Sequence, residues 1–210
     1  EVVSQYPDVL LAVDTVSSFS ATPINTTENS IDVVLTGSQK ALALPPGLAL
    51  FTVSEKALER AKSTSNRGFY FDFLEFHKNW EKMMTPSTPC ISLLYGLQHQ
   101  LSKIFNEGLD ERYTRHIQLN SMVHNWVEEN NFQHFAPEGY RSKSLTCVAN
   151  NLNIDVPSWI SSMREKHSLI INGGYGKIKG TTFRISNMGD ETKESIASML
   201  EAITDTLPLP

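Results

Sequence analysis

The chain has 210 residues, of which 40% are hydrophobic, and this length suffices for one large or two modest domains with a buried core. Its 18 basic and 23 acidic side chains give a net charge of -5, without a basic stripe interleaved with aromatic residues, which argues against a nucleic-acid partner. We expect no membrane partner and no secretory leader, because no apolar run approaches about 18 residues and no leader-like segment opens the chain. The two cysteines, Cys90 and Cys147, lack CxxC spacing, so we expect a cytoplasmic protein without a metal site.

Three short apolar runs predict strands in the first quarter of the chain, over Val9–Val13, Ile31–Leu35 and Leu48–Val53. The polar segment between the first two runs is too short to hold a crossover helix of any size. After the third run, Ser54 is the expected N-cap of a helix. These elements predict part of an α/β sheet domain.

Two side chains with useful chemistry follow the first two predicted strands. Asp14 ends the first run, and Lys40 lies just past the second. If the strands are parallel neighbours, both side chains emerge at the same edge of the sheet, where open α/β sheets bind ligands. A desolvated lysine there is an amine nucleophile able to form a Schiff base with an aldehyde, although a lysine after a strand is more often a solvated loop residue.

Pyridoxal 5'-phosphate is the cofactor that suits this pair of groups. It needs an amine to hold its aldehyde and a carboxylate to keep the pyridine nitrogen protonated, because only the protonated ring stabilises a carbanion strongly. The pattern therefore indicates Lys40 as the covalent anchor and Asp14 as the partner of the ring nitrogen.

The middle of the chain is rich in aromatic residues and helix signals. The run Phe69–Trp80 could form a base-stacking surface, but without accompanying basic residues packing is the better interpretation of its aromatic side chains. The segment TPSTP at 85–89 precedes a helix with apolar residues at helical spacing from Leu94 to Phe105. Its Ser87 or Thr88 either caps that helix or offers a hydroxyl to an anion at the helix N-terminus.

A second domain is predicted from Gly108 onward, which divides the chain into residues 1–107 and 108–210. A long helix with an inward face that includes Ile117 is expected over 109–131, followed by a helix over 156–166 and a closing amphipathic helix. The strands of this domain are expected over 132–135, 144–149, 168–171 and 182–185. This order of elements predicts a small α+β domain.

The glycine-rich segment 173–180, GGYGKIKG, does not have the spacing of a phosphate-binding loop and is expected to be a tight connection between two strands. Arg184 follows it inside an apolar run, where an unpaired guanidinium would be costly. Its partner could be a structural salt bridge, or a ligand carboxylate held by two parallel hydrogen bonds.

Four segments together resemble one protein family: VDTVSS at 13–18, TGSQKAL at 36–42 with Pro45-Pro46-Gly47 after it, TPSTP at 85–89 and FRISNMG at 183–189. Their sequence and order are similar to those of class V aminotransferases, pyridoxal-phosphate enzymes of fold type I, and most similar to the alanine/serine–glyoxylate aminotransferases. The resemblance covers nearly the whole chain. It implies the last part of the large, mostly parallel-sheet domain followed by the smaller α+β C-terminal domain. The phosphate-binding glycine loop and the ring-stacking aromatic residue that the family carries upstream are not in this sequence, so we expect weak cofactor retention by these residues.

The resemblance also implies roles for the residues that match the motifs. Lys40 would hold the cofactor and act as the base that moves the substrate α-proton, with Asp14 at the ring nitrogen. Val16 would pack on one ring face, Gln39 would hydrogen-bond near the phosphate, and Ser38 would make a weaker contact.

Two further residues acquire roles in this way. Thr88 would reach the cofactor phosphate of the other subunit of a homodimer, and the aromatic segment would lie near the subunit interface. Arg184 would hold the α-carboxylate of the substrate.

The implied reaction moves an amino group from alanine or serine to a keto acid such as glyoxylate or pyruvate. A phosphoserine aminotransferase shares this scaffold and remains an alternative. A cysteine desulfurase is disfavoured, because Gln39 stands where a histidine is usual and Cys90 is not suitably placed. A non-catalytic dimerisation module is the alternative from a different functional class.

Overall fold

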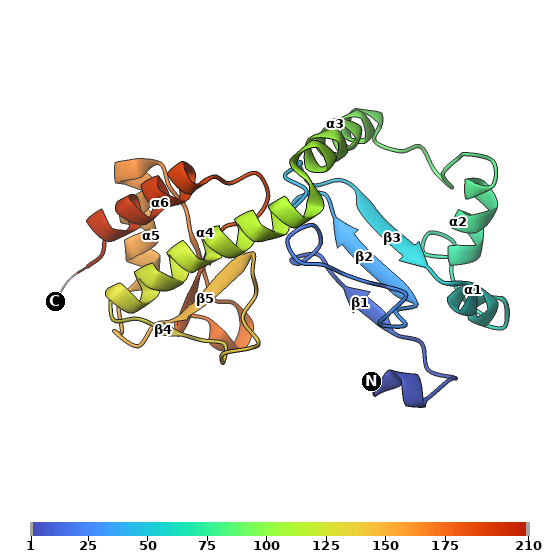
Figure 1. Ribbon diagram of the computed structural model, residues 1–210, viewed down its shortest axis with the longest axis horizontal. Coiled ribbons are helices and arrows are strands. Elements are labelled where there is room, and N and C mark those ends of the chain that lie inside the picture. Colours follow the sequence, from blue (N-terminus) through green and yellow to red (C-terminus); the bar gives the residue numbers. More distant parts are fainter. Residues whose placement is uncertain (1, 209–210) are drawn as a thin grey trace. The chain divides into compact units, whose positions relative to one another are not determined.

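The computed structural model describes residues 2–208, which form two units. The first unit extends to Asn106 without Ser20–Thr22, and the second contains Ser20–Thr22 and the chain from Glu107 onward. Ser20 groups with the second unit because the Arg112 side chain, 1% exposed, donates from Nε to Ser20 Oγ at 2.8 Å. In Figure 1 the first unit is coloured blue to green and the second yellow-green to red.

A three-stranded sheet, ordered β1-β2-β3, organises the first unit. Strands β1 (Ala12–Asp14) and β2 (Val33–Gly37) run parallel, with Asp14 opposite Leu35. Strand β3 (Ala49–Val53) pairs antiparallel with β2, so only one of the two pairings in this sheet is parallel. The β-branched pair Val33 and Val34 is buried, which is the arrangement that favours a strand at the centre of a sheet.

Four helical segments accompany this sheet: a 3-10 turn at Val3–Gln5, α1 (Glu55–Lys62), α2 (Phe73–Trp80) and α3 (Ile91–Glu107). The predicted cap of α1 is confirmed, because Ser54 Oγ accepts a hydrogen bond from Ala57 N at 3.1 Å. Asp72 caps α2 in the same way, with its carboxylate accepting from Leu74 N at 3.0 Å.

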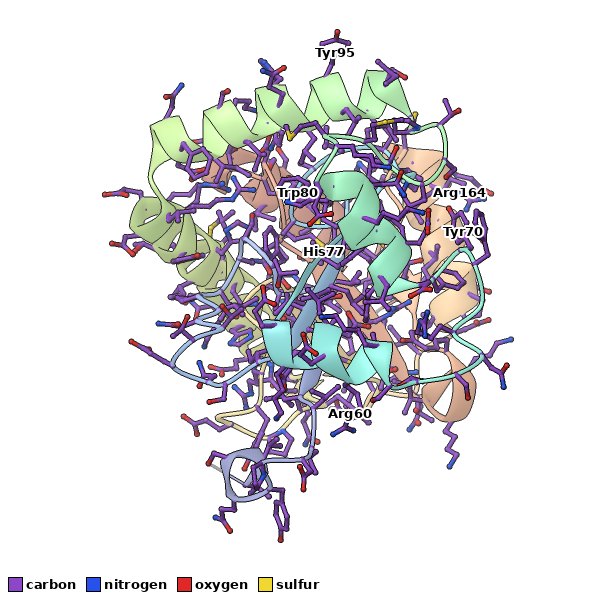
Figure 2. The ribbon with its side chains drawn as sticks, turned by 90° about the vertical axis from the view of Figure 1, so that its right-hand side faces the viewer. Arg60, Tyr70, His77, Trp80, Tyr95 and Arg164 are labelled. Atoms are coloured by element: carbon purple, nitrogen blue, oxygen red, sulfur yellow. The ribbon has the colours of Figure 1, made fainter. Side chains whose placement is uncertain are left out.

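Much of the aromatic segment is exposed, so several of its side chains are not buried among the described residues. Phe69, Tyr70, Phe71 and Trp80 are between 64% and 82% exposed, although Phe73 and Phe76 contact Phe51. The apolar face of α3 is partly open: Leu94 and Phe105 are 40% and 67% exposed, whereas Ile104 is 3% exposed. Figure 2 shows Tyr95 projecting outward from α3. Helical spacing identifies an apolar face but does not identify the surface that covers it.

Helices and an antiparallel sheet make up the second unit, in the order α4 (Leu109–Glu129), β4 (Gln133–His134), β5 (Leu145–Ala149), α5 (Val156–His167), β6 (Asn172–Gly173), β7 (Thr182–Ser186) and α6 (Lys193–Asp205). The sheet order is β4-β5-β7-β6 with every pairing antiparallel. A 3-10 turn at Gly176–Ile178 lies in the connection from β6 to β7. Figure 1 shows α4, α5 and α6 gathered beside this sheet.

A continuous apolar core joins these elements. Trp159 on α5 is 2% exposed and packs edge-on against Phe183 of β7, while Ile196 and Ile203 of α6 are fully buried, as the closing amphipathic pattern predicts. Full burial of such side chains is worth about 1.5–3 kcal/mol each.

Two expectations for the second unit are wrong. Residues 168–171 are not a strand, because Ser168 takes a left-handed conformation (φ 53°) that ends α5, and pairing with β7 begins only at Asn172. Ile117 is 47% exposed on α4, whose inward face instead includes His116 and Asn120. The predicted N-cap of α5 is confirmed, with Asp155 accepting from Ser158 N at 3.3 Å. Across residues 2–208, no helix is both long and apolar enough to cross a membrane.

Candidate functional site

Asp14 and Lys40 follow the carboxyl ends of two neighbouring parallel strands. Asp14 is the last residue of β1, and Lys40 comes three residues after the end of β2. Thr15 fastens the end of β1 to β2, with its backbone N and its Oγ1 both donating to Leu35 O, at 2.9 Å and 2.8 Å. The parallel register therefore brings the carboxylate and the amine to the same edge of the sheet.

The Asp14 carboxylate is exposed and only partly engaged. Its Oδ1 accepts a hydrogen bond from Val16 N at 2.9 Å, which closes a short turn at the end of β1 and holds Val16 next to the carboxylate. Within residues 2–208, no basic side chain forms an ion pair with Asp14. One carboxylate oxygen is thus available to a cationic or N–H-bearing ligand.

Ser38 fixes the loop that carries Lys40. The fully buried side chain donates from Oγ to Pro45 O at 2.8 Å and accepts from Leu48 N at 3.2 Å. Its backbone N also donates to Leu48 O at 3.1 Å. Because the hydroxyl is used within the loop, the structure indicates a positioning role for Ser38, which sequence reasoning treated as a weak ligand contact.

Lys40 is half-buried, and the residues after it, Ala41 and Leu42, are each 1% exposed. The described part of the chain offers no carboxylate in ion-pair range of its amine. Gln39 beside it is exposed, and its amide folds back toward Gly37, where an added Cβ would lie 2.6 Å from Gln39 Oε1. An unpaired amine on a loop anchored by apolar residues can react with an incoming carbonyl.

Thr88 is exposed and lies outside the first turn of α3. That helix begins at Ile91, and the first carbonyl to accept from it is that of Cys90, with Leu94 N at 3.1 Å. The interpretation of Ser87 or Thr88 as the helix cap is therefore wrong, because both residues belong to the loop that precedes α3.

Arg184 lies on β7 in the second unit, opposite Cys147 of β5 and Asn172 of β6. Its Nε donates to Gly173 O at 3.1 Å, and its Cζ lies 4.8 Å from the centre of the Tyr175 ring. Among residues 2–208 no carboxylate lies within ion-pair range of Arg184, so the described chain contains no salt bridge to this residue. Since both cross-strand neighbours are uncharged, the terminal guanidinium nitrogens can hold an anion.

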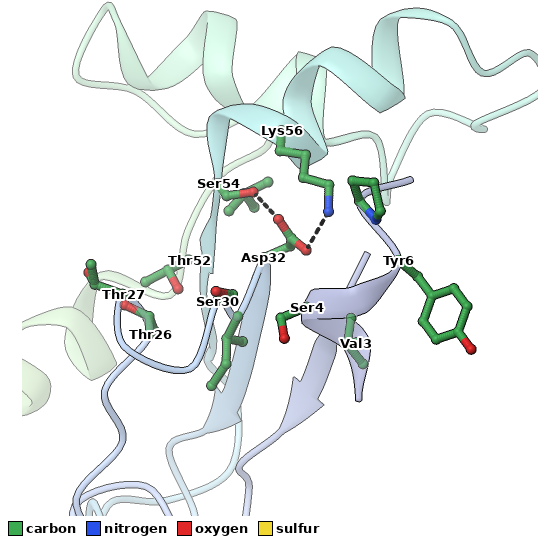
Figure 3. Close-up of a pocket in the computed structure, with 13 residues that line it drawn as sticks. Val3, Ser4, Tyr6, Thr26, Thr27, Ser30, Asp32, Thr52, Ser54 and Lys56 are labelled. Carbon is green, nitrogen blue, oxygen red and sulfur yellow. Dashed lines mark hydrogen bonds and ion pairs between the residues drawn. The ribbon is translucent and has the colours of Figure 1, made fainter. Parts of the chain in front are cut away.

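A buried carboxylate that sequence reasoning missed is Asp32, at the start of β2 and hence the opposite edge of the sheet from Asp14. It lines a cavity of about 620 Å³ (Figure 3). Burial raises the pKa of this carboxyl, but hydrogen bonds from Leu11 N (2.9 Å) and Ser54 Oγ (2.8 Å), together with the Lys56 ammonium at 3.7 Å, outweigh it and leave the pKa below its ordinary value. Because these donors satisfy the carboxylate, Asp32 joins β2 to α1 and is not a free acid or base.

Two polar arrangements in the second unit also escaped sequence reasoning. His116 is fully buried, with Nδ1 against Arg112 O at 2.8 Å and Nε2 accepting from Gly189 N at 3.2 Å; burial lowers its pKa. The rings of His124 and His134 lie 4.4 Å apart, and among the described residues His124 Nε2 and both ring nitrogens of His134 have no hydrogen-bond partner. His134 Nε2 lies 3.7 Å from Glu128 Oε1. Single histidines scattered among polar residues give no signal in a sequence that they will meet.

Known proteins match this chain over most of its length, and residues 1–198 fit the family model for Aminotransferase class-V. An uncharacterized aminotransferase of Methanocaldococcus jannaschii is 37% identical over 205 residues, covering 97% of this chain and 53% of that protein. The serine–glyoxylate aminotransferase of Arabidopsis thaliana is 35% identical over 197 residues, covering 92% of this chain and 49% of that enzyme.

The fold matches solved structures equally well. The alanine–glyoxylate aminotransferase of Nostoc sp. superposes with a TM-score of 0.88 at 28% identity, covering 94% of this chain and 54% of that one. This similarity confirms the predicted fold type I architecture. The chain spans about half the length of the curated relatives it matches. By the family model, which covers most of its residues, the chain belongs to the class V aminotransferases.

Proposed function

We propose that this chain provides the lysine anchor, the ring-nitrogen partner and the carboxylate clamp of a pyridoxal-phosphate-dependent aminotransferase. The observation that carries the proposal is the parallel pairing of β1 with β2, which brings Asp14 and Lys40 to one edge of the sheet. Lys40 has an amine without an ion-pair partner in the described chain, and Asp14 has a free carboxylate oxygen. These are the two groups that the cofactor requires, so the residues present fit it.

When bound, pyridoxal phosphate supplies a protonated ring that draws electrons from the substrate's α-carbon and so makes the α-proton removable. In this proposal the Lys40 amine would hold the cofactor aldehyde and, when free, would act as the base that accepts the substrate's α-proton on Nζ. The Asp14 carboxylate keeps the proton on the ring nitrogen, and its turn with Val16 N fixes the direction of the carboxylate.

The remaining residues would hold the cofactor and the substrate. Val16 supplies an apolar contact to the ring, Gln39 a hydrogen bond near the phosphate, and Ser38 holds the Lys40 loop through Pro45 and Leu48. Thr88, on an exposed loop, would reach the phosphate in the other subunit of a homodimer.

Arg184 would bind the α-carboxylate shared by amino-acid and keto-acid substrates. Its half-buried guanidinium has no protein carboxylate within reach in the described residues, which supports this role. For the substrates we propose alanine or serine as the amino donor and glyoxylate or pyruvate as the acceptor. The names of the similar enzymes, serine–glyoxylate and alanine–glyoxylate aminotransferase, support that choice.

The lysine assignment is tested by incubating the chain with less than one equivalent of pyridoxal phosphate, reducing with borohydride and mapping the modified peptides by mass. We expect the cofactor mass on the peptide that contains Lys40, and its loss in Lys40→Arg. Lys78→Arg is the matched control, since the Lys78 side chain is 63% exposed on α2. Label distributed over exposed lysines, with Lys40 no more modified than Lys78, would contradict the assignment.

The substrates require a separate assay of the protein. Amino-group transfer is measured from alanine, serine, aspartate and glutamate, each with glyoxylate and with 2-oxoglutarate. We expect transfer from alanine or serine to glyoxylate to be the fastest combination. Faster transfer from aspartate to either acceptor, or from glutamate to glyoxylate, would exclude the proposed donor class while leaving the lysine assignment intact.

A further inference from the structure

The glycine-rich connection from β6 to β7 holds a fixed conformation beside Arg184. Gly174 N donates to Thr182 O at 2.8 Å, and a Cβ added at Gly174 would lie 2.2 Å from Thr182 Oγ1 and 2.3 Å from Ile178 O. Only glycine fits there, because all three atoms nearest to such a Cβ belong to the backbone of Ile178 or to the buried Thr182. The residue that follows, Tyr175, is therefore held at a defined place.

Tyr175 places its ring on the guanidinium of Arg184. The ring centre lies 4.8 Å from Arg184 Cζ, within the range of a cation–π contact, although the side chain is 71% exposed. An exposed tyrosine on a loop gains little from core packing, so the contact with Arg184 is its main interaction in the unit. A ring against one face of the guanidinium limits rotation about the last bonds of the arginine side chain.

A second contact fixes the same guanidinium within its plane. Arg184 Nε donates to Gly173 O at 3.1 Å, from the same connection that carries Tyr175. The carbonyl occupies the Nε side, and the Tyr175 ring lies beside the guanidinium carbon. What remains is the edge formed by the two terminal nitrogens, which can donate two parallel hydrogen bonds to a carboxylate.

We infer that Tyr175 is a positioning residue for the carboxylate clamp: it stacks on Arg184 and, together with Gly173 O, presents the terminal nitrogens to the substrate's α-carboxylate. This inference rests on the proposed clamp role of Arg184. It also explains the glycine-rich segment, because the tight turn at Gly174 places the Tyr175 ring next to Arg184. Losing the contact should weaken carboxylate binding roughly 2- to 5-fold, the ratio that corresponds to an exposed cation–π contact.

The stacking is tested first without any ligand, by the nuclear magnetic resonance signal of the Arg184 Nε–H group, assigned through its loss in Arg184→Lys. A ring over the guanidinium shields this proton, so Tyr175→Leu should move the signal downfield, whereas Tyr175→Phe should leave it in place. Tyr140→Leu is the control, because Tyr140 is 85% exposed in the same unit. An unchanged signal in Tyr175→Leu would overturn the inference.

The consequence for binding is tested by titrating the same variants with acetate, the smallest carboxylate probe, against chloride at equal ionic strength. We expect Tyr175→Leu to weaken acetate binding roughly 2- to 5-fold and Tyr175→Phe to leave it unchanged. If Arg184→Lys weakens acetate binding but Tyr175→Leu does not, the positioning role fails and the clamp stands. If Arg184→Lys has no effect, the clamp itself fails, and with it the carboxylate part of the proposed function.

Discussion

In the second unit Trp159 is 2% exposed at the centre of a continuous apolar cluster, whereas in the first unit Trp80 is 69% exposed at the end of α2. The contrast extends to the whole units. Among the described residues, Leu42 is the one member of the first unit in the set of large side chains that are almost completely buried. The apolar content of a segment thus does not decide whether it builds a core; the second unit surrounds its aromatic residues with its own elements, and the first unit does not.

The candidate catalytic groups lie in the first unit, which has fewer completely buried large side chains. Asp14 and Gln39 are exposed and Lys40 is half-buried. The Asp14 carboxylate is held by Val16 N, and the loop that carries Gln39 and Lys40 is held by the hydrogen bonds of Ser38 and by the buried residues that follow Lys40. Short parallel strands and a pinned loop are enough to define the edge of the sheet. Stability and chemistry are therefore expected to respond to different substitutions.

The largest expected effect is on the core of the second unit. Trp159→Ala should lower the free energy of unfolding by about 3–5 kcal/mol, because it opens a cavity among Phe132, Phe183 and their neighbours. The matched change Trp80→Ala should alter it by less than about 0.5 kcal/mol, as expected for a mainly exposed side chain. Denaturant unfolding followed by circular dichroism measures both, and equal losses for the two tryptophans would remove the distinction between the units.

A smaller effect is expected from the histidine pair of the second unit. Burial, followed by the charges of His134, Arg141 and Lys143, lowers the pKa of His124 to about 4 from 6.5, against the opposing effect of Glu128. Between these two pH values the unfolded chain binds a proton at His124 that the folded chain does not bind. The free energy of unfolding should therefore fall as the pH drops from 6.5 to about 4 and level off below that. The loss is on the order of 2 kcal/mol after allowance for solvent screening.

Unfolding midpoints between neutral pH and pH 4 measure this dependence. His124→Leu should flatten the curve in part, with the remainder due to His116 and His134, whose pKa values burial also lowers. His77→Gln, a change to a half-exposed side chain on α2, serves as the control. A curve for His124→Leu as steep as that of the unchanged chain would show that the pair does not set the acid sensitivity of the second unit.

The comparison also separates what the sequence predicts from what it does not. Strands β1 and β2, the Ser54 and Asp155 caps and the closing helix are local patterns of apolar spacing and hydrogen-bonding side chains, and these were predictable. The exposure of Phe71 and Trp80 was not, because it depends on whether another surface faces them.

The same distinction applies to the site residues: some could be predicted from the local sequence, and others could not. Asp14, Lys40 and Arg184 could be proposed because each has a chemistry at odds with its neighbours: a carboxylate at the end of a strand, an amine just past a buried run and a guanidinium within an apolar one. The buried hydroxyl of Ser38 and the ring of Tyr175 over Arg184 depend on where loops return in space. Distances of that kind are set by tertiary contacts, which no spacing along the chain encodes.

The central claim is that Lys40 and Asp14 serve opposite ends of one pyridine ring, and the protonation state of that ring tests it directly. The measurement is the ¹⁵N chemical shift of the ring nitrogen in isotopically labelled pyridoxal phosphate linked to Lys40, recorded at mildly alkaline pH. We predict a protonated ring nitrogen in the unchanged chain and an unprotonated one in Asp14→Ala, with the link to Lys40 retained in both. A ring nitrogen whose protonation is the same with and without the Asp14 carboxylate would contradict the account.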